Sequence, residues 1–225
     1  MRLYAIFSIE VVSLKDIPVF TTQLGAASLV LSQIPYTKAA YIRIQSTLQP
    51  EAFLQECISF CRAVGAEHIY ATGHSLCESF PEHTRILKMQ ASTDVIDRTD
   101  ACLFPVTEQS LSRFVEIYNR KIVHISNGAW MDRQASEKLL RDGNGYFIHR
   151  DGTLLGIAMA AGEKIDWVAS VQPGAGTDVV RALCNVLSGE TVALEVASTN
   201  RKAIDLYESL GFAVVQEICR WYCVL

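Results

Sequence analysis

Hydrophobic and polar residues change their spacing along the chain, and these changes predict its elements. Residues 41–44 alternate and indicate a strand. A helical stripe follows, starting after Thr47 and Pro50 and ending at Gly65, and residues 68–71 again indicate a strand. The stripe consists of Phe53, Leu54, Cys57, Ile58 and Cys61. Because a crossover helix usually joins parallel strands, we expect a parallel β-α-β unit here.

From residue 101 onward the spacing is more regular. We expect a strand over 101–106, a helix starting at Thr107, a helix from a cap at Asp132 through Leu140, and strands over 145–149, 153–160 and 165–171. The first of these helices has the stripe Leu111, Phe114, Val115, Tyr118 and Ile122. Asp151-Gly152 is typical of a hairpin turn. The predicted order of elements is a strand, two helices and three hairpin-linked strands.

The last part of the chain repeats a strand, helix and strand. Residues 192–196 are an apolar run, and a helix after Asn200 has its apolar stripe at Ala203, Leu206, Tyr207 and Leu210. Gly211 ends this helix, and residues 212–215 are again extended.

The N-terminal segment has fewer signals. Residues 3–12 fit either a strand or a helix, and Asp16-Ile17-Pro18 is typical of a helix start. The polar residues 91–100 lack periodicity and are interpreted as a linker. We therefore expect an accessory α/β domain at 1–95 and a larger α/β domain at 96–225.

Composition limits the classes of function. The net charge of −4 argues against a nucleic-acid partner, and no apolar run is long enough to cross a membrane. The N-terminus lacks the pattern of a cleaved signal. Seven cysteines without a CxxC pair favour free thiols in the cytoplasm. The sequence leaves open whether the protein forms a homodimer.

Metal binding is not expected. Cys57 and Cys61 are one helical turn apart and could ligate a metal, but free cysteines are more often buried in a core. His68, His74 and His83 have no zinc-site spacing.

A glycine-containing turn at residues 171–177 separates a predicted strand from a helix with the stripe Val179, Val180, Leu183, Val186 and Leu187. Backbone amides and the helix dipole at such a turn favour an anion. Val179 stands where a dinucleotide fingerprint needs its third glycine, and the Lys of a Walker loop is absent. A tight turn without a ligand is the alternative.

Residues 200–212 have the spacing Asn-x-x-Ala-x-x-Leu-Tyr-x-x-x-Gly-Phe. This pattern resembles the C-terminal signature of the GCN5-related N-acetyltransferase (GNAT) superfamily. Leu194-Glu195-Val196 and residues 206–212 are most similar to its ribosomal-protein alanine N-acetyltransferase branch. The resemblance implies a GNAT fold over 96–225, which is α/β with α+β character and has a mixed central sheet flanked by helices. The order of elements predicted from residue 101 onward is that of this fold, and residues 1–95 resemble a degenerate half of it.

The resemblance also implies a site for acetyl-coenzyme A (acetyl-CoA). By position, the acetyl and pantetheine groups would be held by Ala169, Ser170, Val171 and Asn200, and the pyrophosphate by Gly174, Ala175, Gly176 and Thr177. Asn200 alternatively caps its helix. One departure is that Pro173 directly precedes Gly174, so a basic or amide residue typical of the family is missing. Arg201 and Lys202 are candidates to compensate.

Two residues are candidates for catalysis. Tyr207 would protonate the leaving thiolate, since the pKa values of a phenol and a thiol are close, at about 10 and about 8.5. Glu195 interrupts an apolar strand and would accept the proton of the amine; burial would favour this by raising its pKa. Their alternatives are a place in an apolar helix stripe for Tyr207 and a structural carboxylate for Glu195.

We therefore expect an N-acetyltransferase that transfers acetyl from acetyl-CoA to the primary amine of a peptide or small molecule. A non-catalytic acyl-CoA-binding or regulatory protein is the alternative. The loop over 124–130, with Asn127 and Trp130, is where the family shapes its acceptor site, and no role is assigned to these residues.

Overall fold

The computed structural model describes residues 19–123, 125 and 128–225, and the chain forms two compact units. The larger contains residues 86–218, and the smaller contains the described residues up to Arg85 together with 219–225. The expected segments at 3–12 and 16–18 lie outside the described residues. The limits of the two units differ from those of the predicted domains, 1–95 and 96–225, whose separate roles stay a prediction.

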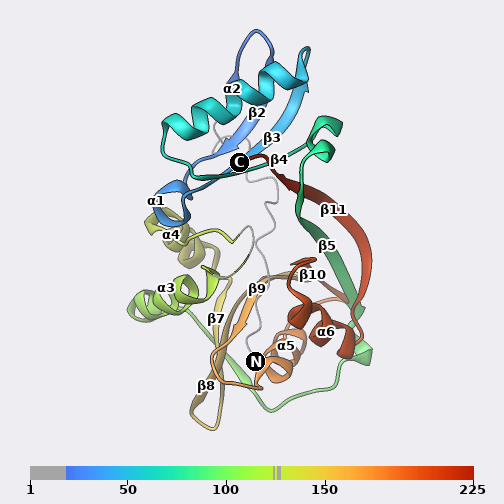
Figure 1. Cartoon of the computed structure of the whole chain (residues 1–225). Helices are drawn as coiled ribbons and strands as arrows, with labels where there is room; N and C mark the ends of the chain where they lie inside the picture. The colour runs from blue at the N-terminus through green and yellow to red at the C-terminus, as the bar shows by residue number, and fades with distance from the viewer. Residues whose placement is uncertain (1–18, 124, 126–127) are drawn as a thin grey trace. The chain divides into compact units, whose positions relative to one another are not determined.

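The smaller unit contains the predicted β-α-β motif (Figure 1). Its parallel strands are β3 (Ala39–Thr47) and β4 (His68–Thr72), joined by α2 (Pro50–Ala63), whose predicted stripe is buried. Its other elements are β1 (Val19–Thr21), β2 (Gly25–Val30), α1 (Ile34–Thr37) and η1 (Ser75–Ser79). Both predicted strands and the helix are confirmed.

The larger unit has the predicted order of elements. After β6 (Cys102–Pro105) come α3 (Glu108–Ile122), α4 (Arg133–Asp142), β7 (Gly145–Arg150), β8 (Thr153–Ala161) and β9 (Lys164–Ser170). They are followed by α5 (Gly176–Cys184), β10 (Thr191–Ala197), α6 (Arg201–Ser209) and β11 (Ala213–Cys223). Asp132 accepts a hydrogen bond from the Ala135 amide, as a helix cap does.

The sheet of the larger unit has the strand order β11-β5-β10-β9-β8-β7-β6. Strands β6 to β9 are antiparallel neighbours, whereas β9 and β10 are parallel. Two apolar clusters lie on opposite faces, one against α5 and α6 and one against α3 and α4 (Figure 1). This is the mixed sheet with flanking helices that the GNAT resemblance implies.

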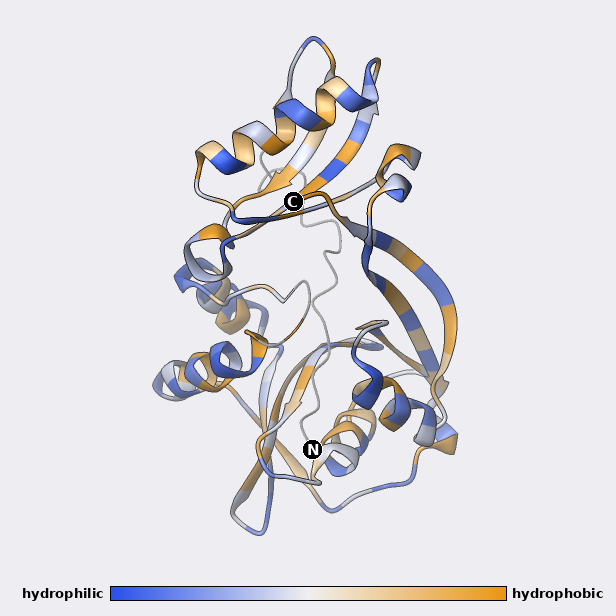
Figure 2. Cartoon of the chain, in the orientation of Figure 1, coloured by the Kyte–Doolittle hydropathy of each residue, from blue (hydrophilic) through white to orange (hydrophobic). Residues whose placement is uncertain are grey.

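One strand of this sheet was not predicted. β5 (Glu82–Ser92) pairs antiparallel with β10, from Ile86 opposite Ala197 to Ser92 opposite Thr191. The predicted linker at 91–100 is therefore wrong at its start, because Ala91 and Ser92 belong to β5 and η2 (Thr93–Val95) follows. Hydrophobic and hydrophilic residues alternate along β5 and β11 (Figure 2).

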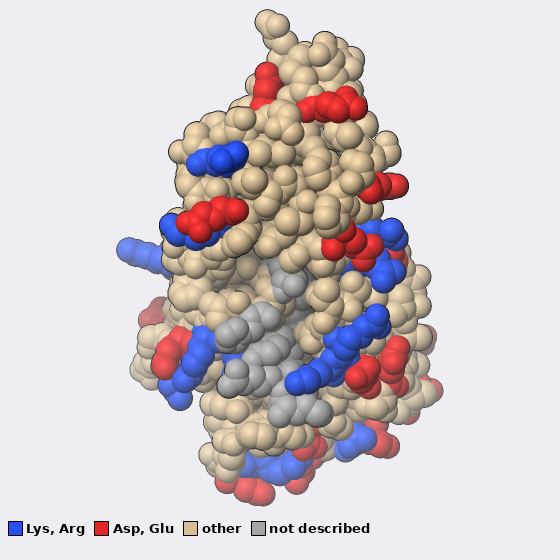
Figure 3. All heavy atoms as spheres, in the orientation of Figure 1, with Lys and Arg blue, Asp and Glu red and all other residues tan. Residues whose placement is uncertain are grey.

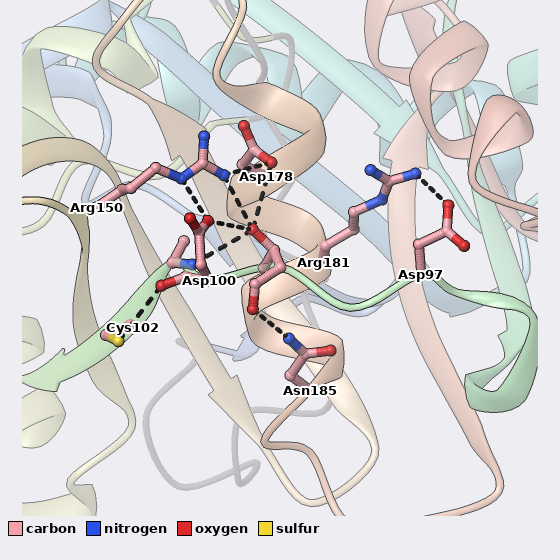
Figure 4. Close-up of polar contacts among 9 residues, drawn as sticks. Asp97, Asp100, Cys102, Arg150, Asp178, Arg181 and Asn185 are labelled. Carbon is pink, nitrogen blue, oxygen red and sulfur yellow. Dashed lines mark hydrogen bonds and ion pairs between the residues drawn. The ribbon is translucent and has the colours of Figure 1, made fainter.

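The segment between η2 and β6 buries Ile96 and Ala101 in the apolar cluster against α5 and α6, and polar contacts also hold it (Figure 4). The Arg150 guanidinium contacts Asp100 at 2.6 Å and Asp178 at 2.7 Å, and donates to the Thr99 hydroxyl at 3.0 Å. Arg181 contacts Asp97 at 2.7 Å. Exposed ion pairs are individually weak, but shared partners make this a network between the segment, β7 and α5.

The helix α5 is shorter than predicted. Its stripe residues Val179, Val180 and Leu183 are buried, but the helix ends at Cys184 and Val186 is 58% exposed. The amides of Val186 and Leu187 both bond to the Leu183 carbonyl, which closes a tight turn instead of a further helical turn.

Candidate functional site

The two parallel strands at the centre of the larger unit separate along their length. In the described part of the chain, β9 and β10 pair at Lys164 with Ala193 and at Ile165 with Leu194. β9 continues to Ser170 and β10 to Ala197. Beyond Ile165 and Leu194, β9 and β10 are no longer paired with each other. Backbone amides and carbonyls at such a separation can bind an extended ligand.

The end of β9 shows which amide faces this opening. The Val171 amide donates to the Leu155 carbonyl at 2.7 Å, so it points toward β8. Because neighbouring residues of a strand point to opposite sides, the Ser170 amide points away from β8 and toward β10. The Lys121 ammonium group of α3 donates to the Ser170 carbonyl at 2.8 Å. Ala169 is paired with Ile157 of β8.

The glycine-containing turn leads directly into α5. Gly174 has φ +81°, which a residue with a side chain rarely adopts. The Ala175 amide is bonded to the Gln172 carbonyl at 3.3 Å, while Gly176 and Thr177 open the helix, and no side chain caps it. Unsatisfied amides of a first turn favour an anion. The carboxylate of Asp178 in the same turn opposes this, although Arg150 pairs with it.

Asn200 lies at the start of α6, as predicted. Its side-chain oxygen accepts a hydrogen bond from the Ala203 amide at 3.4 Å, so the capping alternative is present. Arg201 and Lys202 follow it and are exposed. Their contact with a phosphate stays a prediction, as does the contact of Asn200 with a pantetheine group.

Tyr207 is fully buried in the apolar cluster between the sheet and α5 and α6. It lies in the predicted stripe, and its ring is 5.8 Å from that of Phe212. Its hydroxyl has no hydrogen-bond partner among the described residues. Burial raises the pKa of Tyr207, so the phenol is protonated at neutral pH. If Tyr207 only filled a position in the apolar stripe of its helix, a phenylalanine would serve equally well. This alternative therefore leaves the hydroxyl unexplained.

Glu195 lies in the middle of β10 and is 8% exposed. Leu194 and Val196 enter the cluster against α5 and α6, so Glu195 points to the opposite face of the sheet. Its Oε1 atom is 3.2 Å from the Lys164 Nζ atom, and its Oε2 atom is buried without a partner in residues 19–123, 125 and 128–225. A carboxylate in this position therefore has half of its hydrogen-bonding capacity unused.

Three further residues at this site were not predicted. Lys164 is the ion-pair partner of Glu195, Lys121 binds the end of β9, and the fully buried Trp167 has an indole N–H without a partner. Lys164 and Trp167 lie on the predicted strand at 165–171 or beside it, so alternation along that strand was the available signal. Lys121 lies on α3, far from β9 in the sequence, so only the three-dimensional structure shows its contact with Ser170.

The expected acceptor loop is described only in part, since residues 124, 126 and 127 lie outside the described residues. Its ends are held by buried polar bonds. The Tyr118 hydroxyl donates to the Ala129 carbonyl at 2.9 Å, and the Asn119 side chain bonds to both the amide and the carbonyl of Met131. Trp130 is half-buried.

The described residues give little support for a nucleic-acid, metal or membrane site. Lys and Arg lie among Asp and Glu on the face drawn in Figure 3, without a broad area of one charge. No cluster of three or more His, Cys, Asp and Glu side chains in the described part could hold a metal. None of the described helices combines the length and the apolar character that crossing a membrane needs. Cys57 and Cys61 are fully buried free thiols.

A hollow of about 550 Å³ lies at the β6–β7 edge and is lined by Cys102, Phe104, His149 and Arg150, among others. None of the predicted site residues lines it. The candidate site is therefore defined by the separating strands and the buried polar atoms, not by this hollow.

Comparison with known proteins finds similarity in structure rather than in sequence. No protein-family profile and no curated protein sequence matches the chain. A GCN5-related N-acetyltransferase from Anabaena variabilis is similar with a TM-score of 0.59 and 16% identity, covering 89% of this chain and 59% of that one. A GNAT-family acetyltransferase from Colwellia psychrerythraea is similar with a TM-score of 0.51 and 14% identity, covering 91% and 84%.

A third solved structure, a conserved protein of unknown function from Staphylococcus epidermidis, matches with a TM-score of 0.57 and 10% identity over 92% of this chain and 93% of that one. Such identities show a common fold and leave function open. The mixed sheet with its flanking helices matches the fold of these acetyltransferases, and the chain has the fold of the GCN5-related N-acetyltransferases.

Proposed function

We propose that this protein is an acyltransferase that moves an acetyl group from acetyl-CoA to a primary amine. The observation that carries the proposal is that two buried polar atoms have no partner among the described residues, Glu195 Oε2 on β10 and Tyr207 Oη on α6. An unpaired buried polar atom costs about 1–3 kcal/mol, which a fold retains where a ligand supplies the partner. The fold shared with acetyltransferases supports the same reading.

The donor would be held along β9 and at the start of α5. The Ser170 amide, which points toward β10, is the candidate for the acetyl and pantetheine groups, and Ala169 and Val171 fix the strand through their bonds to β8. The first turn of α5, with Gly174, Ala175, Gly176 and Thr177 around it, is the candidate for the pyrophosphate. Asn200 would contact the pantetheine arm while capping α6.

In the proposed reaction, the amine nitrogen forms a bond to the thioester carbon and the carbon–sulfur bond breaks. Glu195 accepts a proton from the attacking amine through its unpartnered Oε2 atom. Lys164 binds Oε1 and stabilises the charged carboxylate, which also limits the positions that it adopts. Tyr207 donates its proton to the departing thiolate, since its raised pKa keeps the phenol protonated.

A second candidate function is acyl-CoA binding without turnover. Two features favour it: Pro173 runs directly into Gly174, which removes residues from the phosphate turn, and Asp178 brings a carboxylate into the first turn of α5. Both lower the expected affinity for a pyrophosphate. Arg201 and Lys202, exposed at the start of α6, are proposed to compensate.

The test is acetyl transfer by the full chain. Acetyl-CoA is mixed with a panel of small amines and short peptides, and released thiol is measured together with acetylated product by mass spectrometry. A peptide with N-terminal alanine belongs in the panel, because residues 194–196 and 206–212 resemble the alanine branch. Thiol release with matching product supports the enzyme. Saturable acetyl-CoA binding without thiol release by any amine supports the non-catalytic candidate instead.

A matching binding experiment tests the phosphate turn. We expect the replacement of Arg201 and Lys202 by Ala to weaken binding of coenzyme A in calorimetric titrations. Unchanged isotherms would remove both residues from the proposed site. The free thiols of the chain are consistent with a role in the cytoplasm, which is part of this proposal.

A further inference from the structure

Trp167 has a polar atom that the proposed reaction does not use. Its side chain is fully buried, and its indole N–H has no hydrogen-bond partner in the described part of the chain. Unpaired buried donors are rare in native proteins, because burial removes the water that would otherwise bind them. An indole can only donate at this position, so the missing partner is an acceptor atom.

The orientation of this indole is fixed by its neighbours. Its ring centroid is 4.5 Å from that of Tyr118, and both belong to the apolar cluster against α3 and α4. The Tyr118 hydroxyl is held by its bond to the Ala129 carbonyl. A ring packed in this way keeps its N–H in one direction, as a recognition group requires.

Trp167 and Glu195 lie on the same face of the sheet at the separating strands. Trp167 is two residues beyond Ile165, the last residue of β9 that pairs with β10. Its cluster is the one against α3 and α4, and Glu195 points to that face because Leu194 and Val196 occupy the other. The donor-binding elements α5 and α6 and the Tyr207 side chain lie on the opposite face.

This face therefore offers one buried acceptor, Glu195 Oε2, and one buried donor, Trp167 Nε1. An amine with an adjacent carbonyl group offers the complementary set, since the ammonium donates and the carbonyl only accepts. A hydroxyl in place of the carbonyl carries a proton on the accepting oxygen itself, next to the indole, whereas the donors of an amide are on its nitrogen. A plain alkylamine would leave the indole unpaired.

We propose that Trp167 selects the acceptor substrate by donating its indole N–H to a carbonyl oxygen next to the reacting amine. The acceptor is then an α-amino amide or the N-terminus of a peptide, rather than an alkylamine or an amino alcohol. This inference rests on the proposed acetyl transfer and adds the class of its acceptor. Trp167 is a specificity residue here and takes no part in proton transfer.

The test compares three amines of similar size: alaninamide, 2-aminobutane and 1-amino-2-propanol. In the native protein we expect kcat/KM for alaninamide to exceed that for each of the others by about tenfold or more, the effect of one hydrogen bond to an otherwise unpaired group. Trp167→Phe keeps the ring and removes the N–H, and it should abolish the preference mainly by raising KM. Trp221→Phe, a buried tryptophan of the smaller unit, is the control and should retain it.

A measurement on the native protein does not depend on the variant's folding. Nitrogen-15 labelling of the three tryptophans gives one indole N–H signal each, and Trp130→Phe and Trp221→Phe assign the third by elimination. Alaninamide should shift the Trp167 signal, and 2-aminobutane should not.

The outcomes separate this inference from the proposed function. Equal use of the three amines, or a preference that persists in Trp167→Phe, refutes the role of the indole while acetyl transfer stands. A Trp167 signal that alaninamide leaves unmoved refutes it as well, whether or not turnover occurs. Absence of transfer to every amine refutes the proposed function.

Discussion

The hydroxyl of Tyr207 allows stability and activity to be separated in one substitution. Tyr207→Phe removes a buried hydroxyl that has no partner in the part of the chain that the structure describes. Removing an unpaired buried polar atom recovers up to about 1–3 kcal/mol of free energy that its desolvation costs. The small cavity left by the oxygen atom costs about 1 kcal/mol. We therefore expect Tyr207→Phe to be neutral or to stabilise the protein by about 1–2 kcal/mol, which raises the Tm by roughly 2–8 °C.

The same substitution should reduce acetyl transfer. A positioned general acid contributes about 10²–10⁴-fold to a rate, so we expect a loss of that order in kcat with little change in acetyl-CoA affinity. Denaturant titration and steady-state thiol release measure the two effects. Higher stability with lower activity is the signature of a polar atom kept for a ligand rather than for the fold.

Tyr118→Phe is the matched control. Tyr118 is equally buried, but its hydroxyl donates to the Ala129 carbonyl at 2.9 Å. Its removal should cost about 1 kcal/mol, opposite in sign to the effect at Tyr207. If Tyr207→Phe loses stability as Tyr118→Phe does and keeps its full rate, the hydroxyl of Tyr207 has a structural partner and the proposed role is wrong.

Further substitutions test the remaining parts of the site. Lys164→Met should lower the free energy of unfolding by about 1–2 kcal/mol in urea titrations, because Glu195 loses its ion-pair partner; Lys164→Arg should restore most of it, and equal losses in both variants would contradict this. Gly174→Ala should cost about 1 kcal/mol by thermal unfolding because of its positive φ, although nothing lies within 4 Å of an added Cβ atom; an unchanged Tm would contradict that reason. A thiol reagent at pH 8 should label the exposed Cys102 first and leave Cys57 unmodified, and labelling of Cys57 in the folded state would contradict its burial. Burial raises the pKa of Cys57 to about 12 from 9.0, so the unfolded state loses this proton first and stability should fall as pH rises from about 9 toward 12, less steeply in Cys57→Ala.

Elements with a complete local pattern could be predicted from the sequence. The stripe of α2, the cap at Asp132 and the stripe of α6 ending at Gly211 are all observed. Each depends on neighbours within a few residues, so periodicity is sufficient to find it.

β5 could not be predicted in the same way. Residues such as Leu87, Lys88 and Met89 have good helix propensity, and the strand is stabilised by β10, whose residues are about a hundred positions later. The last two residues of this strand, Ala91 and Ser92, were therefore interpreted as the start of a linker. Long-range pairing prevailed over local preference.

The candidate site was predicted in its polar residues but not in their partners. Glu195 was conspicuous as a charge within an apolar strand, and its cost is offset by Lys164, which the parallel register brings beside it. Trp167 was indistinguishable from an ordinary core aromatic, since only the three-dimensional structure shows that its N–H lacks a partner. The functional roles of these residues stay proposals.

The proposed activity is tested most directly by mixing the native protein with acetyl-CoA and a short peptide that has a free N-terminus, and by following thiol release and peptide mass together. The account predicts that each released thiol is matched by one acetylated peptide, and that Glu195→Gln lowers the rate by about 10²-fold or more. Thiol release that is absent, or that proceeds equally in the native protein and in Glu195→Gln, would contradict it.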